Sequence, residues 1–422
     1  MLDTLQTAGR ILAGTWPRLL AWYVAGWLAR YLIIELAGTI GVNSTLGAFL
    51  VLPLAALARL VSFIAMFLTM REAMPNYSTL TGAQRPQFMS SVLAAILPFF
   101  LFYAAWGFLK DDVVAYQLSA FGKVNWFTDS VGEGEVDTLA FDVVTIAVVV
   151  ATYAARWLIK RNRERLPKWT ALVAAYCEAV WVFFTLFLIG DLIGFVTDWM
   201  NARAAVHWWN DFTGAVNVVF SWLDPVQQGI GWVLDQLGGL LLEPLAWLAI
   251  AGVVFGQALG SVTYGRLRAL ERPLEQVKAR YAKLPEWSRR RLADVGESSI
   301  SRWKTITDAL LLIWRAGAVP MSLYVLAYSI VLAGEQWLVH ALGPIVGPQE
   351  QLIWFLIDTP IAVVVDTIFQ PLLFVLVAAA YDYCLASISR GTRANEGSSE
   401  TTAIVSETSP VSSGTMNGTS TT

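Results

Sequence analysis

The chain has 422 residues, a formal net charge of −3 at pH 7, 56% hydrophobic residues and only 14% charged residues. Soluble domains carry about 25% charged residues, so this composition, with a mean hydropathy of +0.55, excludes an ordinary soluble enzyme and a disordered protein. It predicts an all-α, polytopic integral membrane protein.

Eight segments are long and apolar enough to cross a membrane, which takes about 20 residues. In chain order they are residues 19–39, 46–70, 88–109, 139–157, 169–193, 240–259, 309–334 and 360–385. Residues 1–18 form an amphipathic lead-in without a cleavage site after an apolar core, so we expect no signal peptide. Ser, Thr, Gly and Asn dominate residues 391–422, where no aromatic residue occurs, and this composition predicts a disordered tail.

Basic residues mark one side of this membrane domain. Six Lys or Arg lie between residues 156 and 168 and eleven between 266 and 304, in loops that alternating spans place on the same side. The opposite loops carry only Lys110, Lys123 and Arg203. Because Lys and Arg favour the cytoplasmic side, we expect both termini to be cytoplasmic. The short loops favour a bacterial inner membrane.

Two longer loops have distinct compositions. The predicted outer loop 194–239 is rich in Trp and suits helices that lie in the membrane interface, or else a folded cap. The predicted inner loop 260–304 is helical and basic, so that 265–304 can bind anionic lipid head groups or can serve only to fix the topology. This loop and the tail are also the candidate contacts for protein partners, and we expect no nucleic-acid partner.

Three predicted spans begin with similar tripeptides that contain proline. They are Pro53-Leu54-Ala55, Pro244-Leu245-Ala246 and Pro360-Ile361-Ala362, and each proline is placed in the first turn of its helix, where the missing N–H has no partner. One interpretation is a bundle of four helical hairpins derived from one ancestor. Chance similarity in a sequence rich in Leu and Ala is the other.

Catalytic and metal-binding motifs are nearly absent from the sequence. The sequence has no phosphate-binding loop, no H-E-x-x-H and no zinc-type spacing among Cys177, Cys384, His207 and His340, so we expect no metal and no cofactor. Asp111-Asp112, at the outer end of the third span, is the best enzyme-like feature. Adjacent carboxylates can bind a metal or act as a base, which makes the pair a weak catalytic candidate. A span end that merely follows the charge rule is the simpler interpretation.

Charged residues inside the predicted spans are the stronger functional signal, because each costs about 2.5–3.5 kcal/mol at mid-span. At a rise of about 1.5 Å per residue, Arg30, Arg59 and Glu178 lie near one level close to the midplane, with Glu35 and Asp366 further out. These five residues either form ion pairs that lock the helices together or line a polar cavity. Two Arg and one Glu at the same level leave one positive charge, which suits an anionic group.

These observations favour a transport or export component for an amphipathic or anionic substrate, with an envelope lipid as one candidate. The alternative is a non-catalytic membrane assembly partner, which would use its basic loop and tail to recruit other proteins. A weaker alternative is a lipid-linked transferase that uses Asp111 and Asp112 on the outer face.

Overall fold

The computed structural model describes residues 2–77, 88–124, 143–162, 165–167, 169–203, 208, 240–255 and 317–407. Within these ranges the chain forms helices and turns and no strand, which confirms the predicted all-α membrane fold. Six of the described helices are long and apolar enough to cross a membrane, and one bent pair brings the number to seven. The predicted sixth span is described as the shorter apolar helix Leu240–Phe255, and residues 256–259 lie outside the described ranges.

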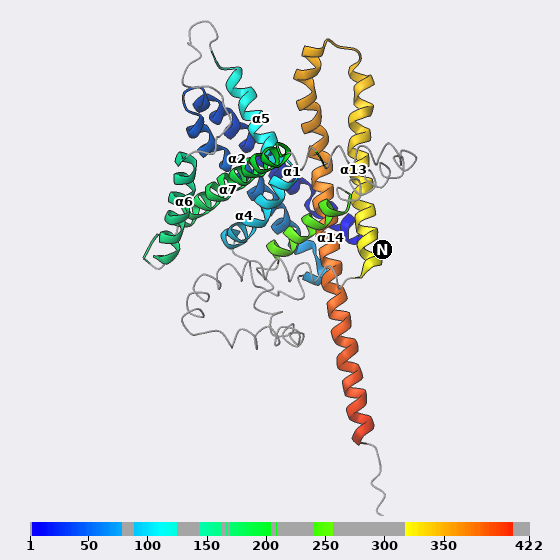
Figure 1. Ribbon diagram of the computed structural model, residues 1–422. Helices are drawn as coiled ribbons and strands as arrows, with labels where there is room; N and C mark the ends of the chain where they lie inside the picture. Colours follow the sequence, from blue (N-terminus) through cyan, green and yellow to red (C-terminus); the bar gives the residue numbers. More distant parts are fainter. Residues whose placement is uncertain are drawn as a thin grey trace, which may run out of the picture.

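Figure 1 shows how the helices are arranged, with α13 and α14 side by side at one edge and α6 beside α7 at the other. The helices are α1 (Leu2–Gly41), α2 (Thr45–Met70), the short 3₁₀ helix η1 (Arg71–Ala73), α4 (Phe88–Ala105), α5 (Phe108–Phe121), α6 (Val143–Arg161), α7 (Thr170–Asn201), helix Leu240–Phe255, α13 (Ala318–Val346) and α14 (Gln351–Glu407).

Helix α2 lies at the centre of the bundle. Two thirds of its most apolar window is buried, as expected for a helix that is hydrophobic on all sides. Phe63 and Phe67 of α2 pack against Phe374 of α14, with ring centroids 4.6 and 4.9 Å apart. They also contact Trp247 and Phe255 of helix Leu240–Phe255. Aromatic contacts therefore join three helices that are distant in the sequence.

Helices α1 and α2 form a close antiparallel pair. Ser44 begins α2, and its Oγ accepts a hydrogen bond from the backbone N–H of Gly47 at 3.1 Å, which satisfies one of the free donors at the helix start. Further along, Ser62 Oγ donates to the Trp22 carbonyl at 2.7 Å. A Cβ atom on Gly26 would lie 2.3 Å from Ser62 Cβ, so this close approach requires a glycine.

The third predicted span, 88–109, is not a straight helix. Helix α4 ends at Ala105, Trp106 and Gly107 form a turn, and α5 leaves at an angle of 74°. Gly107 has a φ of 81°, a left-handed conformation that glycine adopts without steric cost. Asp111 and Asp112 therefore lie in the first turns of a second helix rather than in a loop beyond a completed span.

The prolines of the proposed repeat do not share a position in their helices. Pro53 lies well inside α2, which begins at Thr45, and Pro360 lies inside α14, which begins at Gln351. The first-turn placement is therefore wrong for both residues. Membrane helices tolerate internal proline because neighbouring groups satisfy the freed backbone atoms. Tyr176 of α7 donates to the Leu50 carbonyl near Pro53 at 2.9 Å.

Two predicted boundaries, one at a loop and one at the tail, differ from the helix ends in the structure. Helix α7 continues to Asn201, past the predicted start of the outer loop at residue 194, and most of that loop lies outside the described residues. The predicted basic loop 260–304 also lies outside them. Helix α14 continues to Glu407, so no helix end marks the predicted tail boundary at residue 391, and residues 408–422 are not among those described.

Asp382 of α14 holds the segment that follows η1. Its Oδ1 accepts a hydrogen bond from the Tyr77 backbone N–H at 2.9 Å, and its Oδ2 accepts one from Asn76 Nδ2 at 2.8 Å. Asp382 is buried, and a buried carboxylate is tolerated when it is hydrogen-bonded in this way. The contact fixes the end of the α2 region against α14.

Candidate functional site

Arg30 of α1 forms an ion pair with Asp112 of α5. Arg30 Nη2 lies 2.5 Å and Nε 2.8 Å from Asp112 Oδ1. The Asp112 side chain is fully buried, and that of Arg30 is 19% exposed. The sequence predicted Glu178 as the acid level with Arg30. The structure supplies Asp112 instead, because the bend at Gly107 turns α5 toward α1.

Tyr103 of α4 completes the environment of Asp112. Its hydroxyl donates to Asp112 Oδ2 at 2.5 Å, so both carboxylate oxygens accept hydrogen bonds. Asp111 is exposed whereas Asp112 is buried, because neighbouring residues on a helix point in different directions. The two carboxylates therefore do not converge on one ion or substrate, and the described residues contain no group of metal ligands.

Arg59 of α2 lies among aromatic rings. Its guanidinium carbon is 4.9 Å from the ring centroid of Phe108, 5.8 Å from that of Tyr103 and 6.0 Å from that of Phe63. Its Nη1 donates to the Tyr103 hydroxyl at 3.5 Å, at the long limit for a hydrogen bond. Among the residues that the structure describes, no carboxylate lies within 4 Å of this guanidinium. Arg59 thus differs from Arg30 although both lie in the interior of the bundle.

A pair of carboxyl groups lies near Arg59. Glu335 of α13 and Asp366 of α14 lie close enough to act on each other electrostatically, and Arg59 acts electrostatically on Asp366. Tyr23 of α1 is within electrostatic range of Arg59, Glu335 and Asp366. Groups from four helices therefore share one polar region. We call Arg59, Tyr103, Glu335 and Asp366 the Arg59 site.

Glu243 extends this polar region to helix Leu240–Phe255. The Tyr328 hydroxyl of α13 donates to Glu243 Oε1 at 3.1 Å, and Tyr324 of the same helix donates to the Pro244 carbonyl at 2.8 Å. Glu243 also acts electrostatically on Glu335. Glu243 and Glu335 are not among the site residues predicted from the sequence, because both lie at or beyond a predicted span end. The apolar residues that follow Gly334, including Trp337, were the signal that α13 continues.

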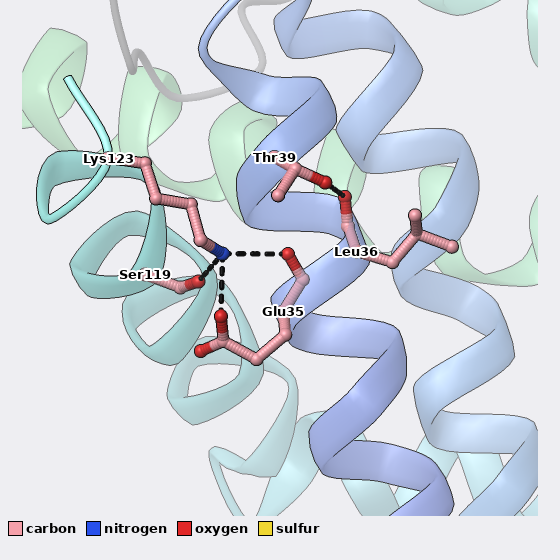
Figure 2. A network of polar contacts seen from close by, with 5 residues as sticks. All are labelled: Glu35, Leu36, Thr39, Ser119 and Lys123. Atoms are coloured by element: carbon pink, nitrogen blue, oxygen red, sulfur yellow. Dashed lines mark hydrogen bonds and ion pairs between the residues drawn. The ribbon is translucent and has the colours of Figure 1, made fainter. Parts of the chain in front are cut away.

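Glu178 and Glu35 belong to two other sites. Glu178 is buried, and its Oε2 accepts a hydrogen bond from Arg156 Nε at 3.2 Å. Glu35 lies near the C-terminal end of α1. Lys123 Nζ donates hydrogen bonds to Glu35 Oε2 at 2.6 Å, to the Glu35 carbonyl at 2.8 Å and to Ser119 Oγ at 2.7 Å (Figure 2). Of the five predicted site residues, Glu178 and Glu35 therefore lie apart from the Arg59 site, whereas Asp366 belongs to it and Arg30 is linked to it through Asp112 and Tyr103.

The observed ion pairs also change the predicted charge balance. The sequence predicted a surplus of one positive charge because Arg30, Arg59 and Glu178 were taken together. Asp112 instead compensates Arg30, and Glu178 pairs with Arg156. Arg59 forms no ion pair with any residue that the structure describes, so the proposal of an anionic ligand now depends on this residue.

No protein-family model, curated protein or solved structure matches this chain. The function is therefore inferred from the geometry of the site.

Proposed function

We propose that this membrane protein is a transport or export component that binds an anionic, amphipathic substrate at Arg59. The observation that carries the proposal is the set of contacts of Arg59. Its half-buried guanidinium has three aromatic neighbours and one long hydrogen bond, and no carboxylate within ion-pair distance among the described residues. An ionised group inside a membrane bundle normally faces a partner or a pathway.

The chemistry of arginine selects the class of ligand. A guanidinium carries five N–H donors in a planar fork that matches the oxygens of a carboxylate or a phosphate. Contact with an aromatic ring stabilises the cation and uses none of these donors. The donors of Arg59 that Tyr103 does not use therefore suit an anionic head group.

The surroundings of Arg59 favour an amphipathic ligand over a free anion. Phe63 and Phe108 contact the guanidinium, and Trp247 and Phe374 pack against Phe63, so the side chains around Arg59 are apolar. An acyl or alkyl chain gains free energy when it packs against such side chains, at about 0.8 kcal/mol per buried CH₂. An envelope lipid with a phosphate or carboxylate head group satisfies both requirements, and the predicted inner-membrane location with cytoplasmic termini places the protein among such lipids.

The alternatives account for other parts of the molecule. Three ion pairs join helices to one another: Arg30–Asp112, Arg156–Glu178 and Lys123–Glu35. A structural or assembly role requires no contacts beyond these ion pairs. A structural or assembly role does not explain why Arg59, which has no ion-pair partner among the described residues, lies in the interior of the bundle. The transferase alternative loses its support, because Asp112 is committed to Arg30 and Tyr103 while Asp111 is exposed.

Binding and transport are both measurable on the full chain in nanodiscs or liposomes of phosphatidylcholine. Decyl phosphate and decanoate should bind, whereas inorganic phosphate and decanol should bind at least tenfold more weakly, a difference of ~1.4 kcal/mol. Arg59→Gln should weaken decyl phosphate binding by a similar factor and abolish movement of a fluorescent phosphatidic acid between leaflets. Arg18→Gln, an exposed arginine of α1, is the matched control. Equal binding and transport by wild type and Arg59→Gln would reject the proposal.

A further inference from the structure

Helix α6 lies at the edge of the bundle, where it packs on α7 (Figure 1). Only 6% of its most apolar window is buried, so most of its side chains face the surroundings of the protein. An apolar helix face of a membrane bundle needs no protein cover, because lipid tails are as apolar as leucine. The exposed face of α6 is therefore a surface for lipid.

One exposed stripe of α6 changes from aliphatic to aromatic to basic along the helix. Its members recur every three or four residues and so share one face of the helix. In chain order they are Ile146, Val150, Tyr153, Trp157, Lys160 and Arg161. About 16 Å of helix separate Val150 from Arg161, at about 1.5 Å per residue. This length is close to one leaflet, which is half of a hydrocarbon core of about 30 Å. The stripe thus matches one phospholipid molecule in length and polarity.

Two exposed tryptophans flank the turn between α6 and α7. They are Trp157 in the last turns of α6 and Trp169 just before α7, and indole rings favour the depth of the lipid head groups. The guanidinium carbon of Arg161 lies 5.1 Å from the ring centroid of Trp157. The turn therefore lies at the level of the head groups, with a cation beside one of the rings.

Three basic residues at this turn have no acidic partner in the part of the chain that the structure describes. Lys160, Arg161 and Arg165 are exposed, and none lies within 4 Å of a described carboxylate. We call these three residues the basic turn. Arg156, by contrast, contacts Glu178 of α7 at 3.2 Å and is neutralised by it. The charge of the basic turn is therefore complementary to an anionic head group.

The other end of the α6–α7 hairpin has a similar arginine–tryptophan contact in a different electrostatic setting. The guanidinium carbon of Arg203 lies 3.9 Å from the ring centroid of Trp199. Asp191 and Asp198 are exposed on the same part of α7. Because these carboxylates repel an anionic lipid, the Arg203 end provides a matched comparison within the same hairpin.

We propose that the exposed stripe of α6 and the basic turn form a binding site for one anionic phospholipid. The aliphatic residues contact an acyl chain, Trp157 lies at the level of the glycerol group, and the basic turn binds the phosphate. Each basic residue near a membrane surface raises the affinity for anionic lipid by about fivefold, which corresponds to about 1 kcal/mol. This site is separate from Arg59 and does not depend on the proposed transport function.

Photolabelling of the full chain tests the lipid site. The protein is reconstituted in phosphatidylcholine nanodiscs with a small fraction of phosphatidic acid that carries a diazirine in its acyl chain, and the labelled peptides are identified by mass spectrometry. Phosphatidic acid should label α6 more strongly than phosphatidylcholine with the same diazirine, by about fivefold or more. Salt should reduce this excess, because it screens exposed charges. Equal labelling of α6 by the two lipids would overturn the proposal.

Removal of the basic turn assigns the effect to particular residues. The variant that combines Lys160→Gln, Arg161→Gln and Arg165→Gln changes exposed side chains only, so it should fold. Its labelling by phosphatidic acid should fall to near the level of phosphatidylcholine, because the three positive charges are gone. A variant that keeps the excess would show that other residues attract the lipid and would overturn the assignment.

A matched control removes three other exposed basic residues. The variant that combines Arg10→Gln, Arg18→Gln and Arg203→Gln has the same net charge as the basic-turn variant, and its labelling of α6 should equal that of the wild type. In the wild type, the peptide around Trp199 should show no excess of phosphatidic acid. An equal loss of α6 labelling in both triple variants would show that net charge alone attracts the lipid, and this result would also overturn the proposal.

Discussion

Arg30 and Asp112 are 82 residues apart in the sequence, yet the guanidinium of Arg30 lies 2.5 Å from the carboxylate of Asp112. The contact depends on the turn at Gly107, which ends α4 and directs α5 back toward α1. An apparent outer-loop acid is thereby converted into an interior partner for a membrane-embedded cation. This pair holds the bent helix in place, whereas no carboxylate of the described residues lies within ion-pair distance of Arg59.

Asp112→Asn should strongly destabilise the protein, because Arg30 would keep its charge in the bundle interior without a counter-ion. Removal of one partner of a buried ion pair typically costs about 3–5 kcal/mol. The double variant Asp112→Asn with Arg30→Gln should recover part of this loss. The measurement is the free energy of unfolding in mild detergent. Asp111→Asn, a change to the exposed neighbour, should alter it by less than about 0.5 kcal/mol. Equal effects of the two Asp changes would show that the pair does not stabilise the fold.

Glu178→Gln and Arg156→Gln should show energetic coupling, whereas Glu178→Gln and Arg30→Gln should be additive. Glu178 contacts Arg156 at 3.2 Å, and residues in one ion-pair network show interaction energies of about 0.5–3 kcal/mol. Distant residues add within about 0.3–0.5 kcal/mol. Double-mutant cycles on unfolding free energy measure both pairs. A large coupling between Glu178 and Arg30 would restore the network that the sequence predicted and contradict the observed pairing.

The sequence predicted the fold class and the approximate location of most helices, because long apolar runs interrupted by basic loops leave few alternatives. It also identified Arg59 and Asp366 as unusual charges within spans. It did not identify their partners. The rise per residue of a helix gives the depth of a side chain, but not which helix its face meets, so Arg30, Arg59 and Glu178 at one level were assigned to one cluster.

Two features of the site could not be inferred from apolar length. The bend at Gly107 depends on a left-handed backbone conformation that a single glycine in an apolar run does not announce. Glu335 was omitted because the predicted span ended at Gly334, where polar residues interrupt the apolar window. The Arg156–Glu178 pair was accessible in principle, since a short connection between two helices makes them antiparallel neighbours.

Gly107→Ala should destabilise the protein by about 1–2 kcal/mol, which is the cost of a left-handed conformation for a residue with a Cβ atom. Nothing lies within 4 Å of a Cβ built at this position, so the effect is conformational rather than steric. Gly107→Asn should cost less, because Asn tolerates this region. Unfolding in detergent measures both variants. If Ala and Asn were equally harmless, the bend between α4 and α5 would not require the positive φ.

Reporter fusions should place the turn after α13 outside the cytoplasm. Positive residues near Arg163 predict that the α6–α7 connection is cytoplasmic, and alternating spans then predict that Gly347, between α13 and α14, is on the opposite side. A phosphatase reporter should be active after Gly347 and inactive after Arg163, and a cytoplasmic fluorescent reporter should show the reverse. The same compartment for both positions would contradict the predicted orientation.

Gly26→Ala should disrupt the contact between α1 and α2, because the new Cβ would lie 2.3 Å from Ser62 Cβ and 2.5 Å from Ser62 Oγ. Overpacking of this kind typically costs about 1–3 kcal/mol. Ser62→Gly in the same chain removes both opposing atoms and should recover most of the loss, although it also removes the hydrogen bond to the Trp22 carbonyl. Gly14→Ala is the matched control in α1, since nothing lies within 4 Å of its Cβ position. That change should be neutral or should stabilise the helix by up to about 1 kcal/mol. Thermal unfolding of the three variants in one detergent decides the matter, and a Gly26→Ala protein as stable as Gly14→Ala would show that α1 and α2 do not approach so closely.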